Sequence, residues 1–517
     1  MSSSTWSVRT PSASPSKFRI IRWRSAGTAA ARRASVVPVR RELLADQVTP
    51  VAVFGRLCAG QESGFLLESV DHGGRWSRWS FAGRSPRARI VSKGGVITTA
   101  GDLPSDLDVS GGMLATVQQL LDAYRAEPDE SLPPLHSGVV GFLGYDVVRE
   151  VEHLPDVPTD DRGWPDAVVS VIGDLVALDH WSQRAILISN VFVPAGATDD
   201  ELLALYDEAR VRLDELAAAG ATPIDEPMVS PPDRSDDLPD VTSSMGAGQY
   251  EAAVEVAKEH IRAGDIFQVV LAQRFDFDLD ADPFDVYRVL RQINPSPYMY
   301  FIREPELCLV GCSPEPMVQL LGGRVISRPI AGTRFRGTTD EHDRKLAAEL
   351  LEHPKERAEH IMLVDLARND VGRVAEYGSV RVSDLMVIER YSHVMHIVSN
   401  VDGRLRPDKS AYDVMRATFP AGTVSGSPKV RAMEIINECE KSKRCAYAGA
   451  VGYFGFDGNL DSCIALRTCV VKDGKAYVQA GAGVVADSDP AYEYRETVNK
   501  ATGMLRAIEW AKQLGES

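Results

Sequence analysis

The sequence predicts an α+β fold built on antiparallel sheets. Turn signals typical of β-hairpins stand at GG (322–323) and at DG (457–458 and 473–474), each between runs rich in strand-forming residues. Helical stretches are interspersed with these hairpins and do not alternate regularly with single strands. Strands joined by tight turns run antiparallel, so this pattern disfavours a doubly wound parallel sheet.

Composition indicates a globular enzyme. The 517 residues include 44% hydrophobic and 25% charged side chains, enough for two large domains or about three smaller ones. A net charge of −16 argues against nucleic acid or an anionic membrane as the main partner, although a small anion responds to local charge. The seven cysteines show no metal-type spacing, which favours reduced thiols and a cytoplasmic protein. No apolar run approaches the roughly 18 residues of a membrane span.

Four regions divide the chain. Residues 1–41 hold nine Arg or Lys, no Asp or Glu and many serines, which predicts a disordered basic extension. The same composition is also found in plastid transit peptides, the alternative for this segment. Residues 42–220 mix strands and helices in a smaller N-terminal α+β domain. Residues 221–240 are rich in Pro and Asp and form the expected linker to a larger domain at 241–515.

In the N-terminal domain, two short segments and one long one have clear periodicity. FLLESV (65–70) and RWSRWSFAG (75–83) are predicted strands joined by the HGG turn at 72–74. DELLALYDEARVRLDELAAA (200–219) places apolar residues at helical spacing and predicts an amphipathic helix.

The larger domain begins with a helix and a strand. Apolar residues recur at helical spacing over 250–261, and Gly264 then turns the chain. IFQVVLAQRF (266–275) reads as a strand, because its side chains alternate between two faces.

Two later helices are predicted at 353–370 and 488–505, each with a proline near its start. Both place two carboxylates three positions apart on one face: Glu356 with Glu359 in the first, and Glu493 with Glu496, followed by Lys500, in the second. Two such pairs can assemble an oxygen-rich site that suits Mg²⁺ and leaves room for water and an anionic substrate. The alternative is two solvated helix faces, and spacing alone favours that alternative.

Three segments combine small residues with groups that favour anions. GAGVVADSDP (481–490) reads as a glycine-rich turn before a helix, where backbone N–H groups can approach an anion closely. FPAGTVSGSPK (419–429) packs Gly, Thr and Ser before another helix. RPIAGTRFRG (328–337) crowds three arginines and two glycines around the small Ala331.

Single polar residues add further candidates. Arg467 lies on a predicted strand and suits bidentate carboxylate binding, although a structural ion pair is an equal alternative. Tyr447 precedes the GAVGYF strand. His393 and His396 in YSHVMHIVSNV lack metal-type neighbours, which favours an acid–base or structural role.

In this order, the segments resemble the chorismate-utilising enzymes, and among them most closely the large subunits of anthranilate synthase. The matching segments are GDIFQVVLAQRF (264–275), NPSPYMYF (294–301), RPIAGTRFRG (328–337), AEHIMLVDLARNDVGRV (358–374), YSHVMH (391–396), FPAGTVSGSPK (419–429), AGAVGYFG (448–455), ALRT (465–468), QAGAGVVADSDP (479–490) and ETVNKA (496–501). The resemblance implies the chorismate-binding enzyme fold for 241–515, in which antiparallel sheets form a layered sandwich with helices outside, and a regulatory role for 42–220.

The resemblance also implies a reaction. Ammonia would add at C2 of chorismate as the C4 hydroxyl leaves, and loss of pyruvate would give anthranilate, the first step of tryptophan biosynthesis. The matching residues are His396, Thr333 and Gln268 for catalysis; Thr423, Tyr447, Arg467, Gly481, Ala482, Gly483 and Lys500 for substrate; and Glu359 and Glu496 for Mg²⁺, with Glu356 and Glu493 beside them. His396 would act as the acid at the C4 oxygen.

Two positions indicate which relative this is. Isochorismate and salicylate synthases carry a lysine base where this chain has Gln268, and an amide cannot activate water in that way. Common aminodeoxychorismate synthases carry a nucleophilic lysine where this chain has Ala331. An inert Ala331 leaves C2 open to ammonia itself. The alternatives are an aminodeoxychorismate synthase lacking that lysine and an inactive tryptophan-binding regulator.

The resemblance implies two further partners. Ammonia would come from glutamine through a separate amidotransferase subunit, in a hetero-oligomer with two of each subunit. Tryptophan would inhibit the enzyme from a pocket formed by LLES and NPSPYM; its residues would be Glu68, Ser69, Pro297, Tyr298 and Met299. The alternative for these five is a packed domain interface.

Overall fold

The computed structural model describes residues 34–70, 78–222, 230–233, 237–391 and 394–515. The basic extension up to residue 33, the predicted HGG turn at 72–74, much of the predicted linker and His393 lie outside the described residues.

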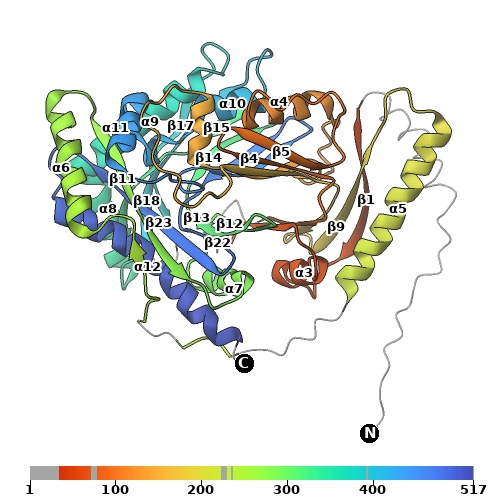
Figure 1. Cartoon of the computed structure of the whole chain (residues 1–517), viewed down its shortest axis with the longest axis horizontal. Helices are drawn as coiled ribbons and strands as arrows, with labels where there is room; N and C mark the ends of the chain where they lie inside the picture. The colour runs from red at the N-terminus through yellow and green to blue at the C-terminus, as the bar shows by residue number, and fades with distance from the viewer. Residues whose placement is uncertain (1–33, 71–77, 223–229, 234–236, 392–393, 516–517) are drawn as a thin grey trace, which may run out of the picture.

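Within these residues, two large antiparallel sheets carry the fold, as predicted (Figure 1). In sheet order, the first contains β1 (Val36–Leu44), β9 (Arg184–Phe192), β8 (Asp174–Asp179), β3 (Trp79–Arg84), β2 (Gly64–Glu68), β12 (Tyr298–Glu304), β13 (Leu307–Ser313), β22 (Thr468–Lys472), β23 (Lys475–Val484), β11 (Gln268–Asp278) and β10 (Thr242–Ser243), with β19 (Gly426–Ser427) beside β11. The second contains β16 (Ile330–Phe335), β18 (Val394–Arg404), β15 (Arg324–Ser327), β14 (Pro316–Leu321), β21 (Leu460–Ile464), β20 (Ala450–Gly455), β6 (Gly138–Leu143), β7 (Ala167–Val171), β4 (Ala88–Lys93) and β5 (Val96–Gly101), with β17 (Arg381–Arg390) beside β18.

Strands from both sides of the predicted linker share each sheet. Strand β2 pairs with β12, with Leu66 opposite Phe301, and β6 pairs with β20, with Val140 opposite Tyr453. One buried cluster joins side chains of both sheets, among them Tyr300 of the first. Part of the hydrophobic core therefore lies between the sheets and joins the chain's two halves, while larger clusters pack the helices against the sheets.

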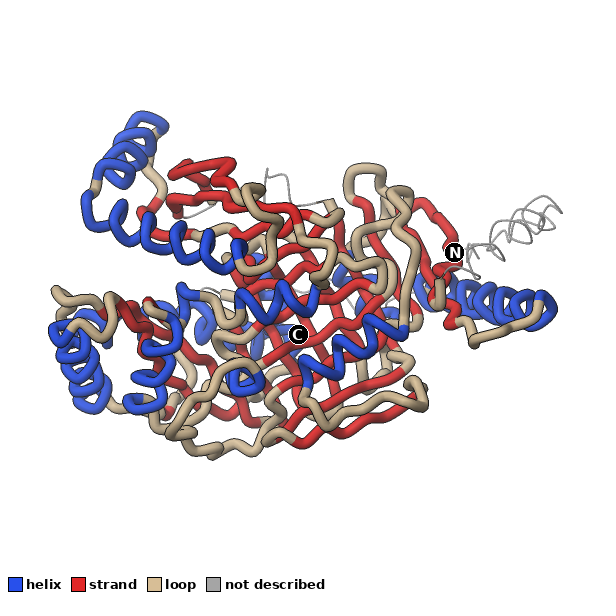
Figure 2. The backbone as a smooth tube through the Cα atoms, turned by 90° about the horizontal axis from the view of Figure 1, so that it is seen from above, coloured by secondary structure: helices blue, strands red, loops and turns tan. Residues whose placement is uncertain are grey.

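Helices cover the outside of the sheets (Figure 2). They are α3 (Pro50–Leu57), α4 (Met113–Ala123), the 3₁₀ helix η2 (Tyr145–Glu150), α5 (Asp199–Ala221), α6 (Ala247–Ala263), α7 (Pro283–Ile293), α8 (Asp340–Glu352), α9 (Pro354–Gly372), α10 (Ala411–Thr418), the 3₁₀ helix η3 (Gly422–Val424), α11 (Lys429–Cys439) and α12 (Pro490–Gly515). The predicted helices at 200–219, 353–370 and 488–505 are confirmed as α5, α9 and α12.

Local signals explain where several elements begin and end. A capping box of Thr198 and Glu201 starts α5, and Gly264, with φ +83°, ends α6 in the left-handed conformation that glycine tolerates. The predicted GG and DG pairs do connect β14 to β15, β20 to β21 and β22 to β23. These turns are therefore confirmed.

Strand β1 starts earlier than the sequence predicts. It begins at Val36, inside the segment 1–41 that was expected to be disordered, and pairs with β9 along its whole length. Val36 and Val39 are buried, whereas the arginines that follow are not. The apolar VVPV run adds an edge strand, which the basic composition of the segment concealed.

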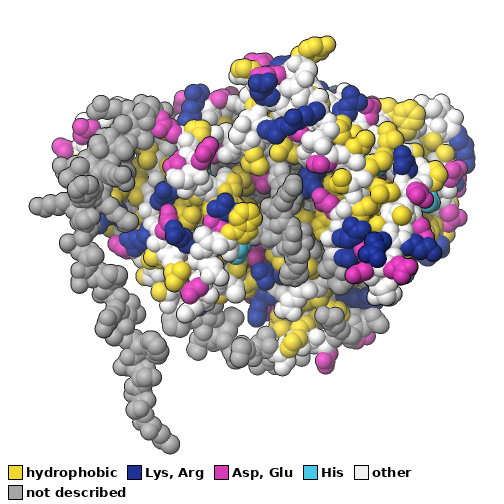
Figure 3. Space-filling view, turned by 180° about the vertical axis from the view of Figure 1, so that it is seen from behind, with side chains coloured by type: hydrophobic (Ala, Val, Ile, Leu, Met, Phe, Trp, Pro, Cys, Tyr) yellow, Lys and Arg dark blue, Asp and Glu magenta, His cyan; other side chains and the backbone are white. Residues whose placement is uncertain are grey.

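The surface mixes both signs of charge. On the face shown in Figure 3, Lys and Arg side chains alternate with Asp and Glu. In the described part of the chain no helix is long and apolar enough to cross a membrane.

Candidate functional site

The segment RPIAGTRFRG forms strand β16 and the turn after it. Gly332, with φ +67°, makes a bulge between Ala331 and Thr333, so Thr333 lies opposite His396 on β18. The Nδ1 atom of His396 lies 3.1 Å from Thr333 Oγ1 and 3.0 Å from the Gly332 carbonyl oxygen. The bulge therefore brings two predicted catalytic side chains together.

The three arginines of this segment are paired with protein carboxylates. Arg328 binds Glu389 at 2.5 Å, Arg334 lies 3.4 Å from Glu356, and Arg336 binds Asp343 at 2.7 Å. These ion pairs hold β16 to β17, α9 and α8, so the arginines shape the loop.

Burial lowers the pKa of His396, and the positive charge of Arg467 acts in the same direction, while the bond to the Gly332 carbonyl partly opposes them. The ring is therefore neutral at pH 7. Because a carbonyl oxygen can only accept, Nδ1 carries the proton that it shares with Gly332, and the lone pair lies on Nε2.

Gly481, Ala482 and Gly483 do not form a turn, contrary to the sequence-based expectation. They lie inside β23, paired with Ala272, Leu271 and Val270 of β11, and the strand continues to Val484. The glycines are needed because side chains cross directly over them. A Cβ at position 481 would lie 2.8 Å from the Tyr447 hydroxyl, and one at position 483 would lie 2.6 Å from Gln268 Nε2. Gln268 and Tyr447 therefore lie against this strand.

The paired glutamates of α9 and α12 belong to one electrostatic neighbourhood. Burial raises the pKa of Glu359, with repulsion from Glu356 adding to it, and Gln268, Lys355 and Lys500 oppose this shift. Because Lys500 belongs to α12, the charge of one helix acts on a glutamate of the other.

The α12 pair behaves in the same way. Burial raises the pKa of Glu493, the Ser488 hydroxyl lowers it, and repulsion from Glu496 raises it further. Lys500 bridges Glu496 at 2.7 Å and the Gly481 carbonyl at 3.0 Å, so it links these glutamates to strand β23.

These carboxylates fit a divalent cation. In each pair, one carboxyl group is partly desolvated and is repelled by its neighbour. A cation between the helices would offset both the cost of desolvation and the repulsion. Among the described residues, no three Asp, Glu, His or Cys side chains gather closely enough to hold a metal by themselves. Glu359 and Glu496 would therefore supply part of the coordination, and substrate and water the rest.

Glu315 is a site residue that sequence analysis missed. Burial raises its pKa to about 8, although Thr423, Lys500 and Arg467 all act to lower it. These three are predicted substrate-binding residues from three separate segments, so Glu315 lies among them. It also lines a small cavity of about 40 Å³ together with Thr423. The only signal in the sequence was a lone glutamate in GCSPEP, which has no partner at a recognisable spacing.

Thr423 and Tyr447 complete the group. Thr423 lies in η3, and its Oγ1 is buried without a hydrogen bond of normal geometry, although it is close enough to Glu315 to lower that carboxyl's pKa. Burial raises the pKa of Tyr447 to about 12, so its hydroxyl remains a donor. Both segments present hydroxyl groups to the region around Glu315 and Gly481.

The five predicted tryptophan-site residues line one cavity of about 830 Å³: Glu68, Ser69, Pro297, Tyr298 and Met299. The cavity lies at the β2–β12 junction, where Met299 is opposite Glu68.

Some polar groups at this cavity have hydrogen-bond or ion-pair partners, and others do not. Arg291 pairs with Glu68 at 3.1 Å, whereas the buried Ser69 Oγ has no hydrogen-bond partner among the residues that the structure describes. Asp461, whose pKa burial raises to about 6, accepts the Tyr298 hydroxyl at 2.9 Å.

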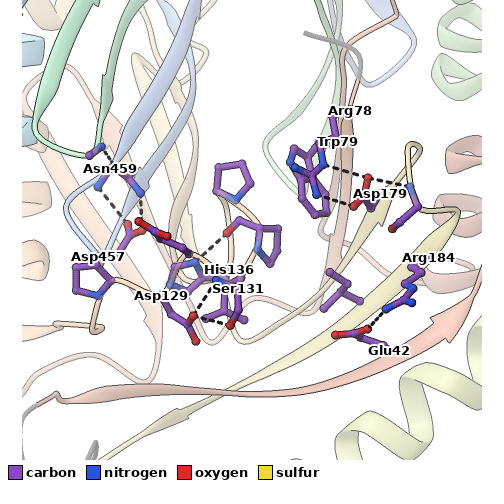
Figure 4. Close-up of a pocket in the computed structure, with 18 of the residues that line it drawn as sticks. Glu42, Arg78, Trp79, Asp129, Ser131, His136, Asp179, Arg184, Asp457 and Asn459 are labelled. Atoms are coloured by element: carbon purple, nitrogen blue, oxygen red, sulfur yellow. Dashed lines mark hydrogen bonds and ion pairs between the residues drawn. The ribbon is translucent and has the colours of Figure 1, made fainter. Parts of the chain in front are cut away.

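A second cleft of about 840 Å³ contains none of the predicted site residues (Figure 4). Its charged side chains pair with one another: Arg78 with Asp179 at 2.9 Å and Arg184 with Glu42 at 2.7 Å. In contrast, the charges of the predicted site residues act on one another around Glu315 and Lys500. The candidate active site therefore lies there.

This fold and this site define a chorismate-binding enzyme. The model of the family described as chorismate binding enzyme matches residues 72–506, and the chain belongs to that family.

Within it, the chain is similar to component 1 of anthranilate synthase. It is 46% identical over 487 residues to that protein of Mycolicibacterium smegmatis, which covers 93% of this chain and 92% of the relative. The component 1 of Acetivibrio thermocellus is 44% identical over 93% of this chain and 97% of its own length.

Solved structures agree. Anthranilate synthase component I of Streptococcus pneumoniae TIGR4 superposes with a TM-score of 0.73 at 36% identity, covering 90% of this chain and 99% of the other. The menaquinone-specific isochorismate synthase MenF of Escherichia coli shares the fold, with a TM-score of 0.67 at 17% identity over 94% of this chain and all of MenF.

Proposed function

We propose that this chain is the large subunit of an anthranilate synthase, a Mg²⁺-dependent lyase that converts chorismate and ammonia to anthranilate and pyruvate. The observation that carries the proposal is that the charges of Lys500 and Arg467 act on Glu315, Glu359 and His396, which come from three separate segments. The names of the relatives and the residues Gln268 and Ala331 support this reaction over that of the other family members.

The substrate would be held through its carboxylates. Arg467 and the Tyr447 hydroxyl would bind the enolpyruvyl carboxylate, with strand residues 481–483 and Lys500 around the rest of the molecule. Mg²⁺ bound by Glu359 and Glu496 would hold the ring carboxylate and offset its repulsion by the protein carboxylates. Glu356 and Glu493 would bind the metal's waters or orient its ligands.

Two side chains are candidates for delivering a proton to the departing C4 oxygen. His396 is implied by the resemblance, but its ring is neutral at pH 7 and its Nδ1 proton is shared with Gly332. Glu315 is protonated at pH 7 because burial raises its pKa to about 8. We propose His396 as the proton donor, with Glu315 as the alternative.

Regulation and nitrogen supply follow from the same proposal. Ammonia would be delivered by an amidotransferase subunit that hydrolyses glutamine, in a cytoplasmic assembly with two copies of each subunit. Tryptophan would bind the 830 Å³ cavity beside Ser69 and inhibit the enzyme by favouring an inactive arrangement.

The test is a product assay. The purified protein is mixed with chorismate, ammonium and Mg²⁺, and anthranilate is followed by its fluorescence. We expect anthranilate and pyruvate in equal amounts, and none when glutamine replaces ammonium and the chain is alone. A product that keeps its enolpyruvyl group would instead identify an aminodeoxychorismate synthase. Absence of any product would contradict the proposal.

A further inference from the structure

Arg444 is one of the largest fully buried side chains of the described structure, with 2% of its surface exposed. Its guanidinium makes a fork-to-fork pair with Glu440, with Nε 2.8 Å from Oε2 and Nη2 2.5 Å from Oε1. The Glu440 carboxylate also accepts the backbone N–H of Ala272 at 2.9 Å. A buried pair of this kind is costly to desolvate, and all of its donors and acceptors must be satisfied.

The remaining donors of Arg444 bind two carbonyls from separate segments. Nη1 donates to the Val424 carbonyl at 2.7 Å, and Nη2 donates to the Val270 carbonyl at 2.7 Å. Val424 follows Thr423, and Val270 lies opposite Gly483 in the β11–β23 pair. One planar group thus sets the spacing between the Thr423 turn and the strand pair that lines the site.

The same guanidinium lies over the rings of two tyrosines. Its central carbon is 5.6 Å from the centre of the Tyr447 ring and 4.8 Å from that of Tyr145 in η2. Tyr447 is the predicted carboxylate clamp, and Tyr145 belongs to the N-terminal half of the chain. Both contacts fall within the range of a cation–π interaction.

The backbone around Tyr447 needs such support. Cys445 has φ +51° and Ala448 has φ +62°, a left-handed conformation that costs a non-glycine residue free energy. The turn is tied to Arg444 by the bond from Tyr447 N–H to the Arg444 carbonyl at 3.1 Å, and to η2 by the bond from Tyr145 N–H to the Cys445 carbonyl at 2.8 Å. Strain of this kind persists only where surrounding contacts determine the conformation.

We propose that Arg444 is the positioning residue of the substrate clamp: it places the Tyr447 hydroxyl against Gly481, and the Thr423 turn against β11, at the spacing that chorismate requires. The proposal rests on the proposed function, because it assigns Tyr447 to a substrate carboxylate. Arg444 itself touches no substrate, and it acts through Tyr447. Through Tyr145, the clamp also takes its position from the N-terminal half of the chain.

The test is a double-mutant cycle between Arg444→Lys and Tyr447→Phe. Lysine keeps the charge but lacks the planar fork, so it cannot bind Glu440 and both carbonyls at once. Tyr447→Phe keeps the ring and removes only the hydroxyl. We expect Arg444→Lys to lower kcat/KM for chorismate by about tenfold or more, chiefly through a higher KM. In the Tyr447→Phe background, the factor by which Arg444→Lys lowers kcat/KM should be at least about fivefold smaller.

A general loss of stability would give a different result, because it would cost the same factor in both backgrounds. Arg431→Lys is the matched control: it lies on α11, its pair with Glu434 is half-exposed, and the variant should keep kcat/KM within about twofold. If Arg444→Lys does not fold, Tyr145→Leu takes its place in the cycle, because it removes a stacking partner from the same guanidinium.

Additive effects in the cycle, or an unchanged kcat/KM in Arg444→Lys, would overturn the proposal. An assay of the unsubstituted protein distinguishes failure of the proposed function from failure of the role assigned to Arg444. If it forms no anthranilate, the proposed function fails. If it is active and the cycle is additive, only the role of Arg444 fails.

Discussion

The His396 Nδ1 atom lies 3.1 Å from the Thr333 hydroxyl oxygen, across a bulge made by Gly332. Sequence separates these two residues by 63 positions. The bulge shifts the register between β16 and β18 by one residue, and without it Thr333 would no longer face His396. This geometry gives the histidine a fixed tautomer, which bears directly on its role.

His396→Ala should lower the amination rate by about 10²–10⁴-fold if the ring exchanges a proton with the substrate. Chorismate should still bind, which calorimetry can establish separately from turnover. A variant that loses affinity alone, with unchanged kcat at saturating chorismate, would assign His396 a binding role.

Glu315→Gln tests the alternative donor: if Glu315 supplies the proton to the leaving oxygen, this variant should lower kcat by a similar factor. In the unsubstituted enzyme, kcat should fall as pH rises through about 8, because Glu315 then ionises. The glutamine variant should lack this limb. If instead the variant keeps near-normal kcat and the same pH profile, the donor is another group.

The raised pKa of Glu315 also predicts how the stability of the protein depends on pH. The folded state holds a proton that the unfolded carboxyl releases near its ordinary pKa of 4.5, so the free energy of unfolding should fall as pH rises from there to about 8. Urea titrations over this range should show a shallower fall for Glu315→Gln than for the unsubstituted protein.

Glu359→Gln and Glu496→Gln should each abolish activity while the fold survives, because each removes charge from the cation site. Mg²⁺ binding measured by calorimetry should weaken in parallel. Glu349→Gln, at a half-exposed glutamate on α8, is the control and should behave normally. Near-normal turnover of either site variant at limiting Mg²⁺ would show that the metal binds elsewhere.

Ser69→Phe should desensitise the enzyme to tryptophan. The Ser69 hydroxyl is buried in the 830 Å³ cavity without a partner in the described part of the chain, and an aromatic ring there would occupy space needed by the inhibitor. Uninhibited catalysis should be nearly unchanged. Ser182→Phe in the other cleft is the control and should keep full inhibition. Equal inhibition of both variants would exclude this cavity as the tryptophan site.

Ala331→Lys should lose most anthranilate formation, because it adds a competing nucleophile where ammonia must attack. Ala331 is only 9% exposed, so a lysine side chain at this position also needs space that the alanine does not occupy. A covalent adduct with chorismate would appear as a mass increase of the intact protein. Ala331→Gly should remain active. Full anthranilate synthesis by the lysine variant, with ammonium saturating, would place this position away from C2.

Local structure was largely predictable. The prolines at the starts of α9 and α12 and the GG and DG turns act within a few residues, so their effects can be read from the chain itself. The Gly481–Gly483 segment was misassigned for the opposite reason. Its glycines make room for Tyr447 and Gln268, which are distant in sequence, and a local pattern cannot distinguish such clearance from a turn.

The sequence by itself determined several helices, the tight hairpin turns and the types of groups available: two carboxylate pairs, an arginine, a lysine and a histidine at recognisable motif positions. Only the tertiary structure decided which of these groups meet. Glu315 acquires a pKa of about 8 because folding buries it, and Arg444 links Val270 and Val424 to Tyr447 because two separate segments converge on its turn. Desolvation and long-range packing are properties of the folded chain, and no spacing along the sequence encodes them in readable form.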